Sequence, residues 1–148
     1  MSEYNIVNIS TIFNKNIKQL LVSIDNSINN NVVFDTIKRQ VRISIDANPL
    51  LLLQEGGPYI FDFRDYIKDD KFDDLFLDTE NILQDKYKNE ISNYSNNIGN
   101  EKSDNILQLL LILRDVWENY SITEKKNIKK NIKVLLSEYC KFLSIGKH

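Results

Sequence analysis

Apolar residues recur along most of the chain at the three- and four-residue spacing of an amphipathic helix. Residues 11–28 keep to one helical face, and Ser10 or Thr11 is placed to cap the N-terminus of that helix. A second such pattern covers residues 32–46, although its β-branched part, residues 41–45, is also compatible with a strand. The three consecutive asparagines between the patterns predict a turn, because asparagine side chains compete for backbone hydrogen bonds.

In the middle of the chain the hydrophobic pattern is interrupted more often. Asn48 and Pro49 predict an N-cap and first helical residue for a short helix ending at Gln54, because proline is favoured at that position. The Gly56–Pro58 segment is predicted to end that helix, and a new helical pattern follows over residues 59–67. A single acidic turn around Phe72 and Phe76 comes next. We expect the aromatic residues of this region to lie in the core and not to form a stacking platform.

The C-terminal half predicts three more helices. One runs over residues 79–94 and is followed by residues 95–103, which are rich in asparagine and predict a flexible surface loop. The most apolar helix of the chain then covers residues 104–119. Ser121 and Glu124 have the spacing of a capping box at the start of the last helix. Because the connection between these two helices is short, they are predicted to pair as an antiparallel hairpin.

These patterns predict one all-α domain spanning residues 1–148. The chain has the length of an ordinary single domain, and its 42% hydrophobic content is sufficient for a core. We expect a compact bundle of about six to seven helices that ends in the helical hairpin, with residues 1–9 as an N-terminal tail. No internal repeat is present in the pattern.

Composition excludes several classes of protein. The chain has 20 Ile, 19 Asn and 15 Lys but only one Ala, which indicates an AT-rich gene. Its apolar runs reach at most five residues, whereas a membrane-spanning helix needs about 18 or more. The first residues lack the basic and apolar regions of a secretory signal, so we expect an intracellular protein that is not secreted. The net charge of -2 predicts no particular partner.

The chain holds few groups for catalysis. Its only histidine is the last residue, His148, and its only cysteine is Cys140, so neither a catalytic triad nor a Cys/His metal site can be assembled. Gly56 and Gly57 do not belong to a nucleotide-binding motif. We therefore predict no catalytic residue, no cofactor and no metal, and a protein that is not an enzyme. Cys140 is interpreted as a small core or boundary residue, with a reactive thiol as the alternative.

An acidic segment in the middle of the chain is the first candidate interaction surface. Its central carboxylates are Asp69, Asp70, Asp73 and Asp74. They could bind Ca²⁺ or Mg²⁺, but the segment lacks the glycine and the alternating spacing of a calcium loop. The other interpretations are a protein-binding acidic surface and a solvated helical face.

A lysine stripe on the last helix is the second candidate surface. Helical spacing places its members along one strip: Lys125, Lys126, Lys129, Lys130 and Lys133. Such a stripe can contact the phosphates of a nucleic acid or an anionic membrane surface, and it can also be the solvated side of an amphipathic helix. It contains neither arginine nor aromatic residues, which sequence-specific readers of bases normally use.

Three stretches resemble, in order and spacing, small helical proteins of large nucleocytoplasmic DNA viruses of protists. They are IFNKNIKQLL, GPYIFDFRDYIKDDKFDDLFLD and LLLILRDVWENYSITEKKNIKKNIKVLLSEYCKFL. The resemblance implies a viral origin, a location in the infected host cytoplasm or the virion, and no assigned enzymatic residues.

The leading hypothesis from the sequence is a non-catalytic protein that acts through contacts with a viral or host protein, either as a virion component or as a regulatory factor. The alternative is an accessory nucleic-acid-binding protein that uses the lysine stripe. A metal-dependent enzyme that uses the aspartates is the third hypothesis. The excess apolar surface of residues 104–119 leaves a homo-oligomer open.

Overall fold

The computed structural model describes residues 5–25, 32–77 and 105–145. Within them the backbone forms seven α-helices, one short 3₁₀ helix and no strand, so the prediction of an all-α bundle is confirmed and the strand alternative for residues 41–45 is wrong. The elements are α1 (Ile6–Asp25), α2 (Val32–Ala47), α3 (Leu51–Asp62), α4 (Arg64–Lys68), α5 (Phe72–Leu77), α8 (Asn105–Val116), the 3₁₀ helix η1 (Trp117–Asn119) and α9 (Ile122–Ile145). The predicted asparagine turn, the helix over residues 79–94 and the flexible loop over residues 95–103 lie outside the described residues.

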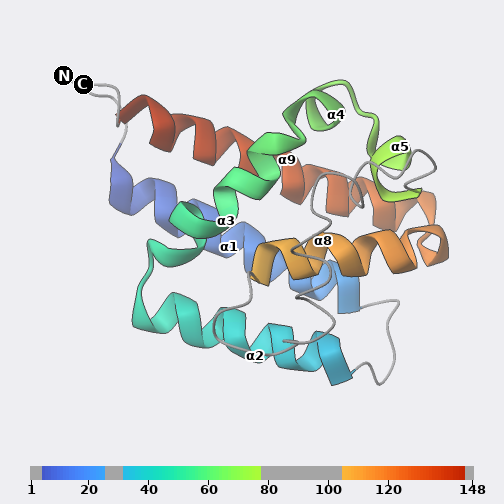
Figure 1. Ribbon diagram of the computed structural model, residues 1–148, viewed down its shortest axis with the longest axis horizontal. Coiled ribbons are helices and arrows are strands. Elements are labelled where there is room, and N and C mark those ends of the chain that lie inside the picture. The colour runs from blue at the N-terminus through green and yellow to red at the C-terminus, as the bar shows by residue number, and fades with distance from the viewer. Residues whose placement is uncertain (1–4, 26–31, 78–104, 146–148) are drawn as a thin grey trace.

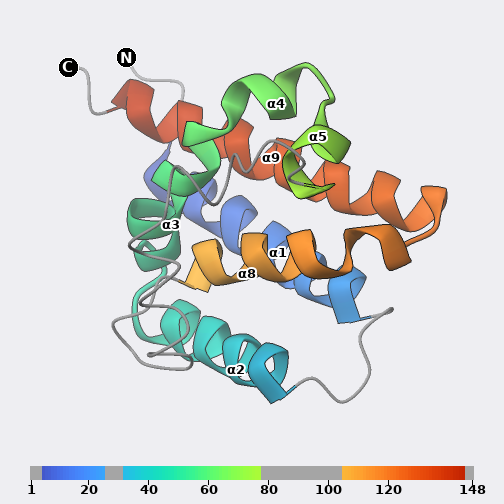
Figure 2. The same ribbon diagram turned by 45° about the vertical axis from the view of Figure 1, so that its right-hand side comes forward.

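The two longest helices, α1 and α9, form the most extensive helix pair of the structure. They run in opposite directions, as both ribbon views show (Figures 1 and 2). α3 packs on both of them, α8 packs on α3, α2 and α5, and α4 lies against α9. The bundle is therefore organised around α1 and α9, with the shorter helices covering their inner side.

Apolar periodicity accounts for the pairing of α1 with α9. On α1 the buried stripe includes Ile9, Phe13, Ile17, Leu20 and Ile24, none of which is more than 3% exposed. On α9 the buried stripe includes Ile128, Ile132, Leu135, Leu136 and Tyr139. Burial of apolar side chains is the main favourable term in folding, so these two stripes hold the long helices together.

The N-terminal helix begins earlier than predicted. The Asn5 side-chain oxygen accepts a hydrogen bond from the Val7 N–H (2.8 Å), and α1 starts at Ile6. Residues 6–9, which the sequence placed in a tail, are therefore helical. Ser10 and Thr11 do not cap the helix, because their hydroxyls donate to the carbonyl of Val7, one turn back. The apolar stripe extends to Ile9, and its burial favours this longer helix.

The C-terminal hairpin has the predicted direction, since α8 and α9 run opposite ways from the turn at η1 (Figure 1). The capping box is present with both of its hydrogen bonds. The Glu124 N–H donates to Ser121 Oγ (3.1 Å), and the Ser121 N–H donates to Glu124 Oε1 (2.9 Å). The two arms pack mainly on other helices, α9 on α1 and α3, and α8 on α3, α2 and α5.

The prediction that the Gly56–Pro58 segment ends a helix is wrong, because α3 runs through it without interruption. α3 lies between α8 and α9, and both glycines are buried at those contacts. A Cβ at Gly56 would overlap the Ile106 side chain, and one at Gly57 would overlap the Tyr139 ring. The glycines therefore allow three helices to approach closely, and this packing outweighs the low helix propensity of glycine.

The start of α3 also differs from the prediction. The Asn48 side-chain oxygen accepts a hydrogen bond from the Leu50 N–H (3.1 Å), so Asn48 and Pro49 form a turn that precedes the helix. The carbonyl oxygen of Pro49 accepts a hydrogen bond from Asn14 Nδ2 of α1 (2.8 Å), which ties this turn to the bundle. α3 begins at Leu51, two residues later than predicted.

Replacing Gly57 by alanine tests the interpretation of the glycine pair. If the glycine only weakened the helix, G57A would stabilise the protein by about 1 kcal/mol. Because a Cβ there meets the Tyr139 ring, we expect a lower free energy of unfolding, by about 1–3 kcal/mol, measured by urea denaturation. Q54A, an exposed position on the same helix, is the control, and a G57A protein as stable as Q54A would contradict the close packing.

Tyr120 joins the end of α1 to the start of α9, and it generates a pH dependence. Its hydroxyl donates to the Ile24 carbonyl oxygen (2.8 Å) in the core. Burial raises the pKa of Tyr120 above its ordinary value of 10.0, and the Glu124 and Asp25 carboxylates raise it further. The unfolded chain ionises this phenol near pH 10 while the folded chain keeps it protonated. Its stabilising contribution is therefore fully present below that pH, and it is lost progressively as the pH rises from there through the higher pKa of the folded protein.

The expected result is a free energy of unfolding that falls more steeply for the natural sequence than for Y120F between roughly pH 8 and pH 11. At the lower pH the variant should be less stable by about 0.5–1.5 kcal/mol, because it lacks the hydrogen bond to Ile24. Urea denaturation at both pH values measures this. Equal slopes in the two proteins would show that Tyr120 is not the titrating group.

Candidate functional site

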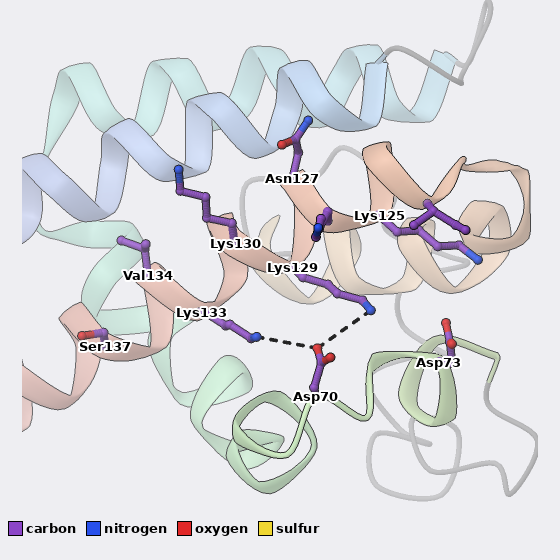
Figure 3. Close-up of a pocket in the computed structure, with 11 residues that line it drawn as sticks. Asp70, Asp73, Lys125, Asn127, Lys129, Lys130, Lys133, Val134 and Ser137 are labelled. Carbon is purple, nitrogen blue, oxygen red and sulfur yellow. Dashed lines mark ion pairs between the residues drawn. The ribbon is translucent and has the colours of Figure 1, made fainter.

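The lysine stripe divides into two rows on α9. Lys125, Lys129 and Lys133 follow one another at four-residue spacing, and Lys126 and Lys130 form a neighbouring row. Figure 3 shows that Lys129 and Lys133 point toward the segment between α4 and α5, whereas Lys130 points toward α1. The two rows therefore face different surroundings.

Asp70 is the partner of the first row. Its Oδ1 lies 3.6 Å from Lys133 Nζ and 3.8 Å from Lys129 Nζ (Figure 3). The ammonium groups of Lys129 and Lys133 also lie within 6 Å of the Phe72 ring centre, at 5.8 and 5.9 Å. Because Asp70 and Lys133 are about half exposed, we expect these ion pairs to contribute at most about 1 kcal/mol each. They hold the lysines in place more than they stabilise the fold.

The backbone explains how Asp70 reaches the lysines. After α4 the Lys71 N–H donates to the Tyr66 carbonyl (2.7 Å) and the Asp70 N–H donates to the Ile67 carbonyl (3.3 Å), the pattern of a Schellman motif. Asp70 occupies the left-handed position of that motif, with φ of 58°, where glycine is usual. Among the described residues it is the one non-glycine with positive φ, and its carboxylate faces α9.

Asp73 has a different role in the same region. Its Oδ1 accepts a hydrogen bond of 2.7 Å from the indole Nε1 of Trp117, which is fully buried. The Trp117 ring packs on Phe76, with centroids 4.9 Å apart, and the Lys125 ammonium lies 5.3 Å from the Trp117 centroid. Trp117 thus belongs to the core. Asp73 supplies the hydrogen-bond acceptor that the buried indole N–H of Trp117 requires.

The acidic segment and the lysine stripe are therefore not two separate surfaces, as the sequence suggested. Asp70 pairs with the stripe, and Asp73 borders the same groove as Lys125, Lys129 and Lys133. The reason is tertiary, because α4 and the turn after it pack against α9. Asp69 and Asp74 remain exposed.

Lys130, of the second lysine row, lies across a groove from α1. That groove is lined by Gln19, Val22 and Ser23 of α1 and by Asn127, Lys130 and Asn131 of α9. Asn131 Nδ2 donates to Ser23 Oγ at 3.5 Å near its floor. On the other side of α1, Lys15 and Lys18 line a second groove that shares Gln19 and Val22 with the first. The two grooves thus form one corrugated surface.

We refer to this surface as the basic face. It consists of Lys15, Lys18, Gln19, Val22 and Ser23 on α1 and of Lys126, Asn127, Lys130 and Asn131 on α9. No carboxylate lines the two grooves beside α1, although the chain has 21 Asp and Glu residues in total. Asp25, at the end of α1, pairs with Lys38 of α2 at 3.4 Å. Lys126 and Lys130 also line the groove of Asp70 and Asp73, but those carboxylates contact Lys129, Lys133 and Trp117. The basic face therefore carries positive charge without an ion-pair partner of its own, on a chain with a net charge of -2.

Reasoning from the sequence missed Lys15 and Lys18. They lie on the polar side of α1, opposite its apolar stripe, and that much could be read from the helical pattern. Nothing in the pattern, however, indicates that α1 is the helix beside α9. The packing of the whole bundle determines that α1 is the helix beside α9.

The remaining candidate groups are metal-ligating side chains and the cysteine. In the described part of the chain no three His, Cys, Asp or Glu side chains are placed to hold a metal ion. Cys140 is a free, half-buried thiol that packs on the edge of the core, as its interpretation as a boundary residue predicted. None of the helices over residues 5–25, 32–77 and 105–145 is long and apolar enough to cross a membrane.

Comparison with models of protein families, with curated proteins and with solved structures gave no match to this chain.

Asp73 and Asp74 provide a matched test of the acidic segment. Both stand in the first turn of α5, but only Asp73 accepts the Trp117 hydrogen bond. We expect D73A to lower the free energy of unfolding by about 1–3 kcal/mol, because it leaves a buried N–H without an acceptor. D74A should change it by less than about 0.5 kcal/mol. Urea denaturation followed by tryptophan fluorescence measures both, and equal effects would assign the loss to the helix terminus instead.

Proposed function

We propose that this protein is non-catalytic and acts by holding an anionic macromolecule against the basic face. The observation that carries the proposal is the distribution of charge. Lys129 and Lys133 have an internal partner in Asp70, whereas Lys15, Lys18, Lys126 and Lys130 line surface grooves and form no ion pair among the described residues. Four such lysines on two neighbouring helices attract anions and raise the rate of association with them.

The geometry also supports a binding role because the face is rigid. The backbone on both sides belongs to the two longest helices, whose apolar stripes are fully buried against each other and the core. Tyr120 and Asn131 add hydrogen bonds between them, to Ile24 and Ser23. Lysines on a rigid pair of helices keep their relative positions, which reduces the entropy lost when a partner binds.

The likeness to small viral proteins predicts, in addition, a viral or host partner and a place in the virion or the infected cytoplasm. The charge distribution of the basic face favours an anionic partner whatever the origin of the chain. Finding the protein in purified virions would favour a structural component over a factor directed at the host.

Charge reversal tests whether the two helices form one face. We expect K15E/K18E on α1 and K126E/K130E on α9 each to weaken binding of the same anionic probe by roughly tenfold or more at low salt. The probes are a nucleic-acid duplex, poly-glutamate, and vesicles containing phosphatidylserine, measured by fluorescence anisotropy or co-sedimentation. Circular dichroism checks that each variant remains folded.

The control is R39E/R42E, which reverses two exposed cations on α2 that do not line the grooves of the basic face. It changes the net charge by the same amount and should leave binding within about twofold. If the natural protein binds none of the three probes, or if the control weakens binding as much as the α1 and α9 variants, the proposed function is wrong.

A further inference from the structure

We infer that the occupant of the basic face is the phosphate backbone of double-stranded nucleic acid, held without reading of the base sequence. This inference rests on the proposed function and names its partner. It is argued from the kinds of side chain on the face, from what the face lacks, and from the position of Asp70.

The side chains of the face are those that contact phosphate and sugar. Between the lysines of α1 and α9 lie Gln19, Ser23, Asn127 and Asn131, which line the groove shared by the two helices. Lysine, serine, asparagine and glutamine are, with arginine and other polar groups, among the residues that contact nucleic-acid backbones, whereas specificity comes from contacts to base edges. The four arginines of the chain, at positions 39, 42, 64 and 114, all lie outside α1 and α9. The face therefore has phosphate donors but lacks the arginine fork that reads guanine.

The spacing of the lysines suits a row of phosphates. Lys126 and Lys130 are four residues apart on α9, which corresponds to about 6 Å along the helix. Lys15 and Lys18 stand on the neighbouring helix, whose axis is about 8–10 Å away in ordinary helix packing. The four ammonium groups thus cover a patch that several phosphates of one duplex can meet, since a strand carries one phosphate per about 3.4 Å of axis.

An acidic protein fits the face less well. Protein interfaces are enriched in aromatic residues, methionine and arginine and depleted in lysine. The basic face has the opposite composition, because the grooves that its lysines line contain no aromatic residue, methionine or arginine. Their apolar residues are aliphatic or proline, and they include Val22 and Ile122, which are 62% and 85% exposed. A protein partner would find charge there but none of the aromatic or arginine anchors that dominate binding hot spots.

A membrane surface and a single strand are also disfavoured. Helices that lie in a membrane interface insert an apolar face, but the apolar stripes of α1 and α9 are buried in the core. Proteins that bind single strands without specificity stack bases on aromatic side chains, and none lines the grooves of the basic face. Duplex backbone is the anion that requires neither feature.

Asp70 limits how many lysines are free for phosphate. It keeps a left-handed backbone that glycine would adopt with less strain, and its carboxylate is the internal counter-charge of Lys129 and Lys133. A phosphate on this side of α9 must displace that carboxylate. Removing the carboxylate should therefore add the first lysine row to the binding surface.

The experiment measures the affinity for a duplex of about 20 base pairs, roughly two helical turns, as a function of salt concentration. Neutralising four phosphates predicts a slope of log affinity against log salt of about -3.6, or a loss of roughly 100-fold between 50 and 200 mM salt. Two duplexes of unrelated sequence should bind equally. The matching single strand, poly-glutamate and phosphatidylserine vesicles should bind at least about tenfold more weakly.

Two variants move the slope in opposite directions. K126Q/K130Q should reduce it by about 1.8, because two phosphate contacts are lost, and R39Q/R42Q is the matched control that should not change it. D70N should bind more tightly at low salt and steepen the slope by up to about 1.8, since it frees Lys129 and Lys133. Asparagine tolerates the left-handed backbone, so this variant is expected to fold, and D70G provides a second one.

The outcomes separate the two proposals. Binding of poly-glutamate or of the vesicles that equals or exceeds duplex binding, and that is lost in K126Q/K130Q, would overturn the duplex assignment and leave the proposed function standing. Preference for the single strand, or for one duplex sequence over the other, would also overturn it. A protein that binds no probe at all refutes both. Unchanged duplex binding in D70N and D70G would contradict the role of Asp70 as a counter-charge.

Discussion

The antiparallel packing of α1 on α9 is the interaction on which the rest of the structure depends. It buries the apolar stripes of the two longest helices, and it places their termini so that Tyr120 can bond to the carbonyl of Ile24. The same packing leaves the polar sides of both helices facing outward next to each other. Because those sides carry lysines, the stability of the bundle and the basic face have a common origin.

The inner side of this pair imposes a second constraint. α3 must fit between α8 and α9, and it does so with two glycines where its neighbours supply Ile106 and the Tyr139 ring. The chain thus uses Gly56 and Gly57 for close packing and not for a turn. This arrangement brings α4 and the turn after it against α9, and so it determines that Asp70 meets Lys129 and Lys133.

The fold therefore places the charged side chains in different environments. One lysine row is compensated by Asp70, Lys125 lies near the Trp117 ring, and the row beside α1 keeps its charge for solvent or a partner. A count of charges gives -2 and predicts no partner, because it averages over these different environments. The local arrangement is the observation on which the proposal of an anionic partner rests.

The sequence by itself determined the all-α class, the apolar periodicity of α1 and α9 and the capping box of Ser121 and Glu124. These features follow from spacing, because they depend on residues three or four apart in one element. The direction of the last hairpin follows from the short connection between its arms. Only the tertiary structure decided which helices are neighbours. That is why Gly56 and Gly57 were misinterpreted, why Lys15 and Lys18 were missed, and why the acidic segment and the lysine stripe were taken for separate surfaces. Contacts between helices depend on how all the buried faces pack at once, and helical periodicity, which is local, carries no information about that choice.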